Sequence, residues 1–124
     1  MLLLPVVRTP WPTPPNADLT QVSEAKLRDY VLNPAHPQGG PKARVFAAVL
    51  GITRTGWQYL RRQLLTGVRA AAAHLRGTTS WGDLYDVALD VTGAAGRVHR
   101  VRTGWIIRTG EDRPHLVTAY VDLS

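Results

Sequence analysis

Apolar residues in the first half of the chain recur at intervals of three and four, the spacing of helices that bury one face. The first such stripe consists of Leu27, Tyr30 and Val31. Thr20 or Ser23 is suited to begin this helix, and the pair Asn33-Pro34 ends it near residue 32. The pattern therefore predicts a short first helix.

Two further helices are predicted after the glycine- and proline-rich turn at residues 33–40. Pro41 suits the first position of a helix and Gly51 the position just after a helix end, so a second helix lies between them. Thr53 or Thr55 begins a longer third helix. It is predicted to extend to about residue 75, because apolar residues keep the helical spacing up to that point.

The spacing of apolar residues changes to two at residue 84, which predicts a strand with one buried face. Its apolar positions are Tyr85, Val87, Leu89 and Val91. Two further strands are predicted at residues 97–108 and 115–121, and glycine-containing turns separate all three.

The pairing of the first two strands depends on the turn around Gly93 and Gly96. A regular two- or four-residue turn would place Leu89 opposite Arg100 and mix apolar with charged side chains, so we expect a one-residue bulge near Gly93 or Gly96. Arg100 and Arg102 would then share a face with two acidic residues, Asp86 and Asp90. On that face, cross-strand ion pairs are the alternative to a ligand-binding role for the two arginines.

These elements predict an α+β fold, with three N-terminal helices packed on one face of a small antiparallel β-meander. The 124 residues fit a single core. Five prolines between residues 5 and 15 favour an extended arm or linker at residues 1–17, followed by one globular domain at residues 18–124. The apolar start at residues 1–7 is too short to span a membrane and lacks the charged start of a signal peptide, so no membrane partner is predicted.

Positive charge is concentrated in one part of the chain. The net charge is +6, and no acidic residue occurs between Asp29 and Asp83, a segment that contains seven lysines and arginines. Arginine suits two-pronged contacts with phosphate, which indicates a polyanionic partner; a solvated arginine-rich surface is the alternative. The absence of cysteine excludes thiol chemistry and disulfides.

The turn before the second helix combines a histidine with two cations. Lys42 and Arg44 fall in the first turn of that helix, where the helix dipole favours acidic residues. A bound phosphate would remove this mismatch, and a lysine lying along Phe46 would do so without a ligand. His36 is then placed for proton transfer beside the anion, although a loop histidine is more often simply solvated.

The sequence has no HExxH, CxxC, GxSxG, Walker or GxGxxG motif, so no metal ion and no cofactor is predicted. Side chains of His, Lys, Arg, Thr and Tyr suffice to cleave RNA. The 2′-hydroxyl of the substrate is the nucleophile, and the protein need only move protons and neutralise charge. The chemistry available therefore favours a metal-independent endoribonuclease.

Three segments within about residues 24–121 carry a family resemblance: KLRDYVLNPAHPQGGPKARVFAAVLGI, GRVHRVRTGWIIR and PHLVTAY. Together they resemble a bacterial domain of unknown function that is found alone and in polymorphic-toxin, adhesin and phage-associated proteins. More distantly, a basic helical half followed by a meander ending in LVTAY is similar to the barnase, colicin D and RelE-like ribonuclease fold. The long third helix departs from that fold.

In that superfamily, basic and histidine residues of the helical region face a Thr or Ser and a Tyr on the sheet. By position, the resemblance implies His36 and Lys42 as the helical contribution and Thr118 and Tyr120 as the contribution of the last strand. Ordinary strand preference is the alternative reason for the last two. The residues predicted to bind RNA phosphates are Arg44, Arg61, Arg62, Arg100 and Arg102.

Two functions remain open. The first is an RNase-like toxin domain that cleaves RNA, with tRNA as a candidate substrate. It would act in the cytoplasm, or in that of a target cell after delivery, and an acidic immunity or antitoxin protein would bind it. The second is a non-enzymatic basic adaptor for a nucleic acid or an acidic protein, in which Arg100 and Arg102 matter more than His36.

Overall fold

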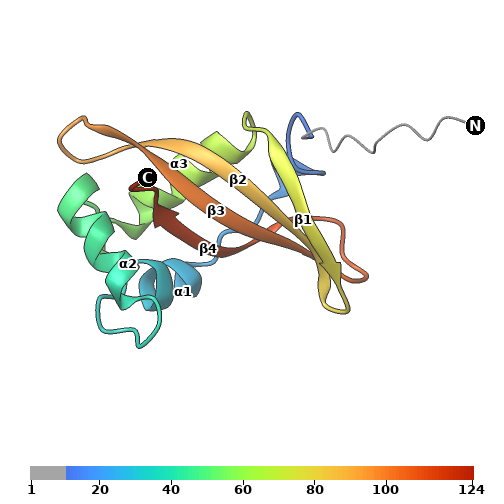
Figure 1. The fold of residues 1–124 in the computed structure, drawn as a ribbon, viewed down its shortest axis with the longest axis horizontal. Coiled ribbons are helices and arrows are strands. Elements are labelled where there is room, and N and C mark those ends of the chain that lie inside the picture. The colour runs from blue at the N-terminus through green and yellow to red at the C-terminus, as the bar shows by residue number, and fades with distance from the viewer. Residues whose placement is uncertain (1–10) are drawn as a thin grey trace, which may run out of the picture.

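A computed structural model describes residues 11–124 as a four-stranded antiparallel sheet with helices packed against it (Figure 1). The helical half contains α1, α2 and α3, whose bounds are Glu24–Lys26, Gly40–Val45 and Trp57–Val68. Two π-helical stretches, Leu27–Val31 and Phe46–Leu50, prolong α1 and α2. The strands follow in the order β1-β2-β3-β4, with bounds Ala73–Thr79, Gly82–Thr92, Val98–Arg108 and His115–Val121. The predicted α+β class is confirmed.

The ends of the first two helices lie where the local sequence predicts them. Ser23 caps α1, because its Oγ accepts a hydrogen bond from the Lys26 N–H at 3.0 Å. Pro41 lies in the first turn of α2. Gly51 follows the π-helical stretch after α2 with φ 64°, a left-handed conformation that favours glycine.

All three helices contribute to one core on the covered face of the sheet. Leu27, Phe46 and Leu64 come from the three helical segments and are 0 % exposed. They meet the inward side chains of the strands, among which Trp105 on β3 is also 0 % exposed. Burial of this apolar surface is what fixes the helices to the sheet.

The third helix is shorter than predicted and the sheet has one more strand. Helix α3 ends at Val68, and the segment expected to continue it forms β1 instead. Ala73 pairs with Val87, so β1 covers the outer edge of β2, whose backbone groups would otherwise lack strand partners. The helical preference of the alanine-rich segment is overridden by this pairing.

The predicted register of the long hairpin is confirmed. Leu89 pairs with Val101 and Asp90 with Arg100, which leaves apolar side chains on one face and charged ones on the other. The ladder between β2 and β3 is regular throughout. The extra residue is taken up by the turn at residues 93–97, where Gly96 has φ 82°.

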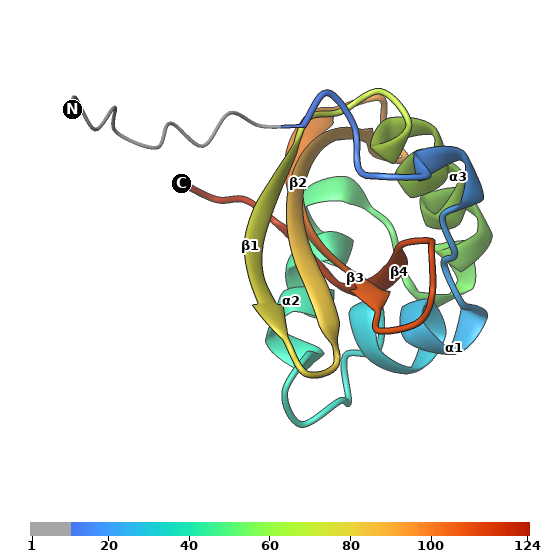
Figure 2. The same cartoon turned by 90° about the vertical axis from the view of Figure 1, so that its right-hand side faces the viewer.

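One face of the sheet remains uncovered. In Figure 2, α3 lies on one side of the strands and β1 curves away on the other side. In the view of Figure 1 the uncovered face is turned to the reader, with α1 and α2 beside β4. We call it the open face. Its side chains come from alternate strand positions, including Asp86, Arg100 and Arg102.

Part of the predicted proline-rich arm, residues 1–10, lies outside the described residues. Trp11 forms an isolated antiparallel bridge with Ala73, with hydrogen bonds of 2.8 and 2.9 Å in the two directions. Among residues 11–124, no helix is both long and apolar enough to cross a membrane.

Candidate functional site

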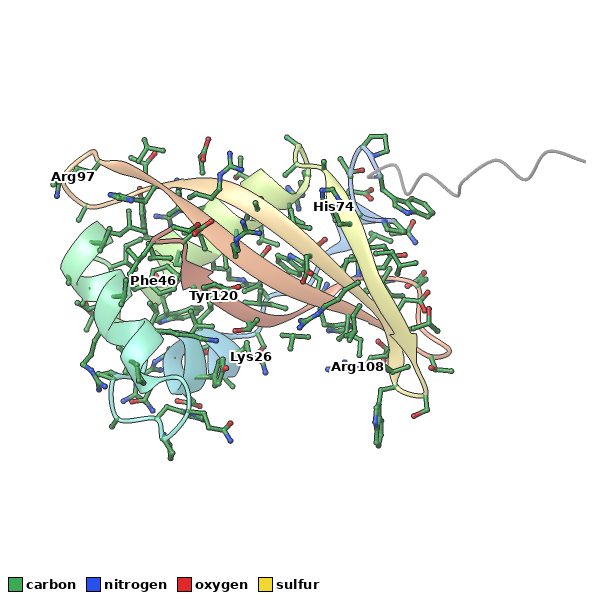
Figure 3. The ribbon with its side chains drawn as sticks, viewed as in Figure 1. Lys26, Phe46, His74, Arg97, Arg108 and Tyr120 are labelled. Atoms are coloured by element: carbon green, nitrogen blue, oxygen red, sulfur yellow. The ribbon has the colours of Figure 1, made fainter. Side chains whose placement is uncertain are left out.

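The open face carries a cleft of about 430 Å³ to which all four strands contribute polar side chains. Those that bear on its chemistry are His74 and Arg76 from β1, Arg100 and Arg102 from β3, and Thr118 and Tyr120 from β4. Figure 3 shows His74 and Tyr120 toward opposite margins of the sheet. The antiparallel pairing of the strands brings the six together, because each occupies a position that faces away from the core.

Lys42 on α2 and Tyr120 on β4 meet at one margin of this cleft. The Lys42 Nζ lies 4.7 Å from the centre of the Tyr120 ring, within the range of a cation–π contact. The structure therefore brings together one residue from the helical pair and one from the strand pair of the predicted site. Thr118 lies two positions earlier on β4 and lines the same cleft.

Thr118 has a buried hydroxyl at the floor of the cleft. Its Oγ1 has no hydrogen-bond partner within residues 11–124. The opposite residue on β3 is Gly104, where an added Cβ would lie 3.2 Å from the Thr118 Cγ2. The absence of a side chain at Gly104 therefore leaves room for the Thr118 side chain at this point of the cleft.

Thr118→Val is expected to raise the free energy of unfolding by about 1 kcal/mol, because a buried hydroxyl without a partner destabilises the folded state and valine has a similar shape. Urea denaturation at neutral pH measures this change. A lower stability of the variant would show that the hydroxyl does have a partner and would contradict the prediction.

His36 forms its contacts within its own loop. Its Nδ1 accepts hydrogen bonds from the backbone N–H groups of Gln38 and Gly39, at 3.1 and 2.9 Å. Its ring lies edge-on to Tyr30, with 4.8 Å between ring centres. Among residues 11–124, no hydrogen bond or ring contact links His36 to Lys42, and the histidine does not line the open-face cleft. These contacts give His36 a role in shaping the turn.

Arg44 also stabilises this turn. Its Nη1 donates a hydrogen bond of 2.9 Å to the carbonyl of Pro34. The same carbonyl would lie 2.6 Å from a Cβ added at Gly40, so the chain passes very close to itself here. The absence of a side chain at Gly40 is therefore needed for this approach of the backbone to itself.

The arginines of the open face are paired with carboxylates. Arg100 lies 3.8 Å from Asp90, as the predicted register allows, and Arg76 lies 4.0 Å from Asp86. Both pairs are more than half exposed in their side chains, so they contribute little to stability and can exchange partners. Arg61 and Arg62 are exposed on α3 and do not line the cleft.

Arg102 has a closer partner in Asp122. Its Nε donates a hydrogen bond of 2.9 Å to Oδ2 of this carboxylate, whose side chain is only 12 % exposed. The terminal nitrogens of the guanidinium still offer N–H donors to a ligand. Hydrogen bonds from the Ser124 hydroxyl and backbone N–H, together with Arg102, lower the pKa of Asp122 from 3.8 to about 2.

Asp122→Asn is expected to flatten the acid dependence of stability. Because the pKa of Asp122 is lowered in the folded protein, its carboxylate stabilises the fold above its ordinary pKa of 3.8, and this stabilisation is lost as the pH falls toward 2. The wild-type chain should therefore lose more stability than the variant over that interval, measured by urea midpoints. Asp90→Asn, at an exposed ion pair, is the matched control. Parallel curves for wild type and D122N would contradict the assignment.

Sequence reasoning missed the β1 side of the cleft. His74 was expected near the end of a helix, but it lies on β1 opposite Asp86. The residues that follow it did carry a signal for a strand and a turn, since two threonines precede Ser80 and Gly82. Within residues 11–124, no group of three His, Asp or Glu side chains is arranged to hold a metal ion.

A family model described as "Domain of unknown function (DUF6883)" matches residues 13–123. The chain therefore belongs to this family, and the matched segment includes every helix and strand described above. Searches of curated proteins and of solved structures gave no match.

Proposed function

We propose that this member of the family binds RNA on the open face of its sheet and cleaves it without a metal ion. The observation that carries the proposal is the convergence of Lys42, Thr118 and Tyr120 with the arginines of β3 around one cleft. Guanidinium groups bind phosphate, and hydroxyl and amine groups can transfer protons. The resemblance of the basic helical half and the LVTAY segment to ribonucleases of the barnase, colicin D and RelE type is a second reason for proposing this activity.

In the proposed reaction, the 2′-oxygen of a ribose attacks the adjacent phosphorus and the bond from phosphorus to the 5′-oxygen breaks. The 2′-hydroxyl gives up a proton, and the leaving 5′-oxygen takes one. Of Lys42 and Tyr120, one is proposed to take the proton of the 2′-hydroxyl and the other to give a proton to the leaving 5′-oxygen. Arg100 and Arg102 are proposed to neutralise the charge that develops on the phosphorane. The products are a 2′,3′-cyclic phosphate and a 5′-hydroxyl.

His74 and Arg76 act at a different point of the substrate in this proposal. Three strand spacings separate β1 from β4, which is roughly 14 Å in a flat sheet. One phosphate does not span that distance. The two β1 residues therefore contact a neighbouring nucleotide. The loop with His36 holds the start of α2, because the Gly40 N–H donates a hydrogen bond of 2.9 Å to the His36 carbonyl.

The test is incubation of the purified chain with total RNA in EDTA. Cleavage by the wild type, strongly reduced in Lys42→Ala, supports the proposal. Arg69→Ala, at the end of α3 on the covered side, removes one charge away from the cleft and should leave cleavage unchanged. Intact RNA at high protein concentration would overturn the catalytic proposal.

Two further experiments test the proposed tRNA substrate and the proposed toxin role. The first is cleavage of purified tRNA by the chain, and the second is the growth of cells that express it.

One observation favours the non-enzymatic adaptor as a second candidate: each of the three cleft arginines already lies beside a carboxylate of the chain itself. An acidic protein, such as an immunity or antitoxin protein, could replace these carboxylates without any chemistry. Binding that weakens steeply with salt, with RNA left intact, would support this candidate.

A further inference from the structure

Trp81 is a large apolar side chain left in water. It lies in the turn between β1 and β2 and is 78 % exposed, the highest value among the large apolar residues described. The other three tryptophans pack to a greater extent: Trp105 is fully buried, Trp57 packs against the core, and Trp11 lies edge-on to Tyr85. Trp81 therefore adds nothing to the core that would explain a residue of this size.

The backbone that carries this indole is held in place. The Trp81 N–H donates to Thr79 Oγ1 at 3.1 Å, and its carbonyl accepts from the Thr109 N–H at 3.0 Å. Thr109 Oγ1 also donates to the carbonyl of Ser80 at 3.1 Å. These hydrogen bonds join the turn to the neighbouring turn after β3, so the backbone that carries the Trp81 ring is held in place.

The turn lies at one end of the basic open face. Arg108 pairs with Gly82, the residue after Trp81, and Figure 3 places Arg108 at this end of the sheet. Arg108 also lies six positions beyond Arg102 on the same face of β3, about 20 Å along the strand. A chain of phosphates that starts in the cleft and follows β3 would reach Trp81.

We propose that Trp81 stacks on an unpaired base of the RNA strand bound in the cleft, which makes the substrate single-stranded. This inference rests on the proposed function. Stacking on an exposed aromatic ring is a main source of affinity for single strands, and it tolerates any base. In a duplex, the bases are stacked on one another and offer no free face to the indole.

The charges around the turn fit a weak phosphate contact beside the stacked base. Arg108 lies 3.8 Å from Glu111, and its side chain is 53 % exposed, so this pair can yield to a phosphate. Glu111 keeps a second partner in His115, with 3.0 Å between Oε2 and Nε2. The acidic residue therefore has an alternative partner when the arginine turns to RNA.

The experiment compares wild type, Trp81→Ala and Trp81→Phe in binding a fluorescent 2′-O-methylated oligoadenylate, which cannot be cleaved at the methylated positions. We expect Trp81→Ala to bind about tenfold more weakly and Trp81→Phe to retain most of the affinity. Binding of a duplex of the same length should be equal in all three. Melting temperatures confirm that the variants fold.

The outcomes separate this inference from the proposed function. If the wild type binds the single strand and Trp81→Ala binds it equally well, the stacking inference is wrong while RNA binding stands. Equal losses for single strand and duplex would also overturn it, since the effect would not be base stacking. If the wild type binds neither RNA, the proposed function is wrong, and the stacking inference that rests on it is wrong as well.

Discussion

Tyr120→Phe should lower the rate of RNA cleavage by about 10²- to 10⁴-fold, the usual contribution of a positioned acid or base. The variant removes only the hydroxyl. The ring remains, so the contact with Lys42 and the packing of β4 should persist. The loss should therefore appear in the maximal rate constant of single-turnover cleavage, with the half-saturating protein concentration nearly unchanged, when a labelled RNA is followed in EDTA.

Two further variants make this result interpretable. Lys42→Arg keeps the positive charge over the ring but cannot readily lose a proton, so it should keep binding and lose cleavage. Val117→Ala, at a partly exposed neighbouring position on β4, controls for general disturbance of the strand. If Tyr120→Phe cleaves at the wild-type rate, Tyr120 only contacts Lys42 through its ring and takes no part in proton transfer.

Local signals explain which helices were predicted correctly. Ser23 determines the start of α1, and Gly51 determines the end of the π-helical stretch that prolongs α2. Both residues act only on the few positions next to them. The end of α3 depends on a distant strand. Ala73 leaves the helical pattern to pair with Val87, a choice that spacing along the chain cannot reveal.

The same distinction applies to the candidate site. The register of β2 and β3 was predictable from the need to separate Leu89 from the charged residues, and it placed Arg100 beside Asp90. The contact of Lys42 with Tyr120 joins residues far apart in sequence, and only the resemblance to ribonuclease folds suggested it. His36 was predicted to lie beside a bound anion because Lys42 and Arg44 follow it in the sequence. In the structure its Nδ1 instead accepts hydrogen bonds from the backbone that follows it, a local arrangement that composition alone does not show.

The open face depends on the core directly behind it. Gly104 and Thr118 form part of the cleft floor, and the next residue of β3, Trp105, points into the core. Its Nε1–H donates to Thr103 Oγ1 at 2.6 Å, and that hydroxyl donates to the Val87 carbonyl at 2.7 Å. This buried chain of hydrogen bonds links the middle two strands beneath the cleft.

Trp105→Ala is therefore expected to lower the free energy of unfolding by about 3–5 kcal/mol, the cost of a large cavity where a fully buried indole stood. That is a large part of the roughly 5–15 kcal/mol that stabilises a typical domain. Trp105→Phe fills much of the cavity and leaves Thr103 free to keep its bond to Val87, so its loss should be clearly smaller. Urea denaturation followed by circular dichroism gives both values.

Cleavage measured on the same variants tests whether the cleft depends on this support. Below its melting temperature, Trp105→Phe should keep the strand pairing of β2 and β3 and retain cleavage, because the indole itself touches no part of the open face. Equal destabilisation by alanine and phenylalanine would show that the hydrogen bond to Thr103, rather than the volume of the ring, holds the two strands together. The loss in Trp105→Ala would then need an explanation other than a cavity.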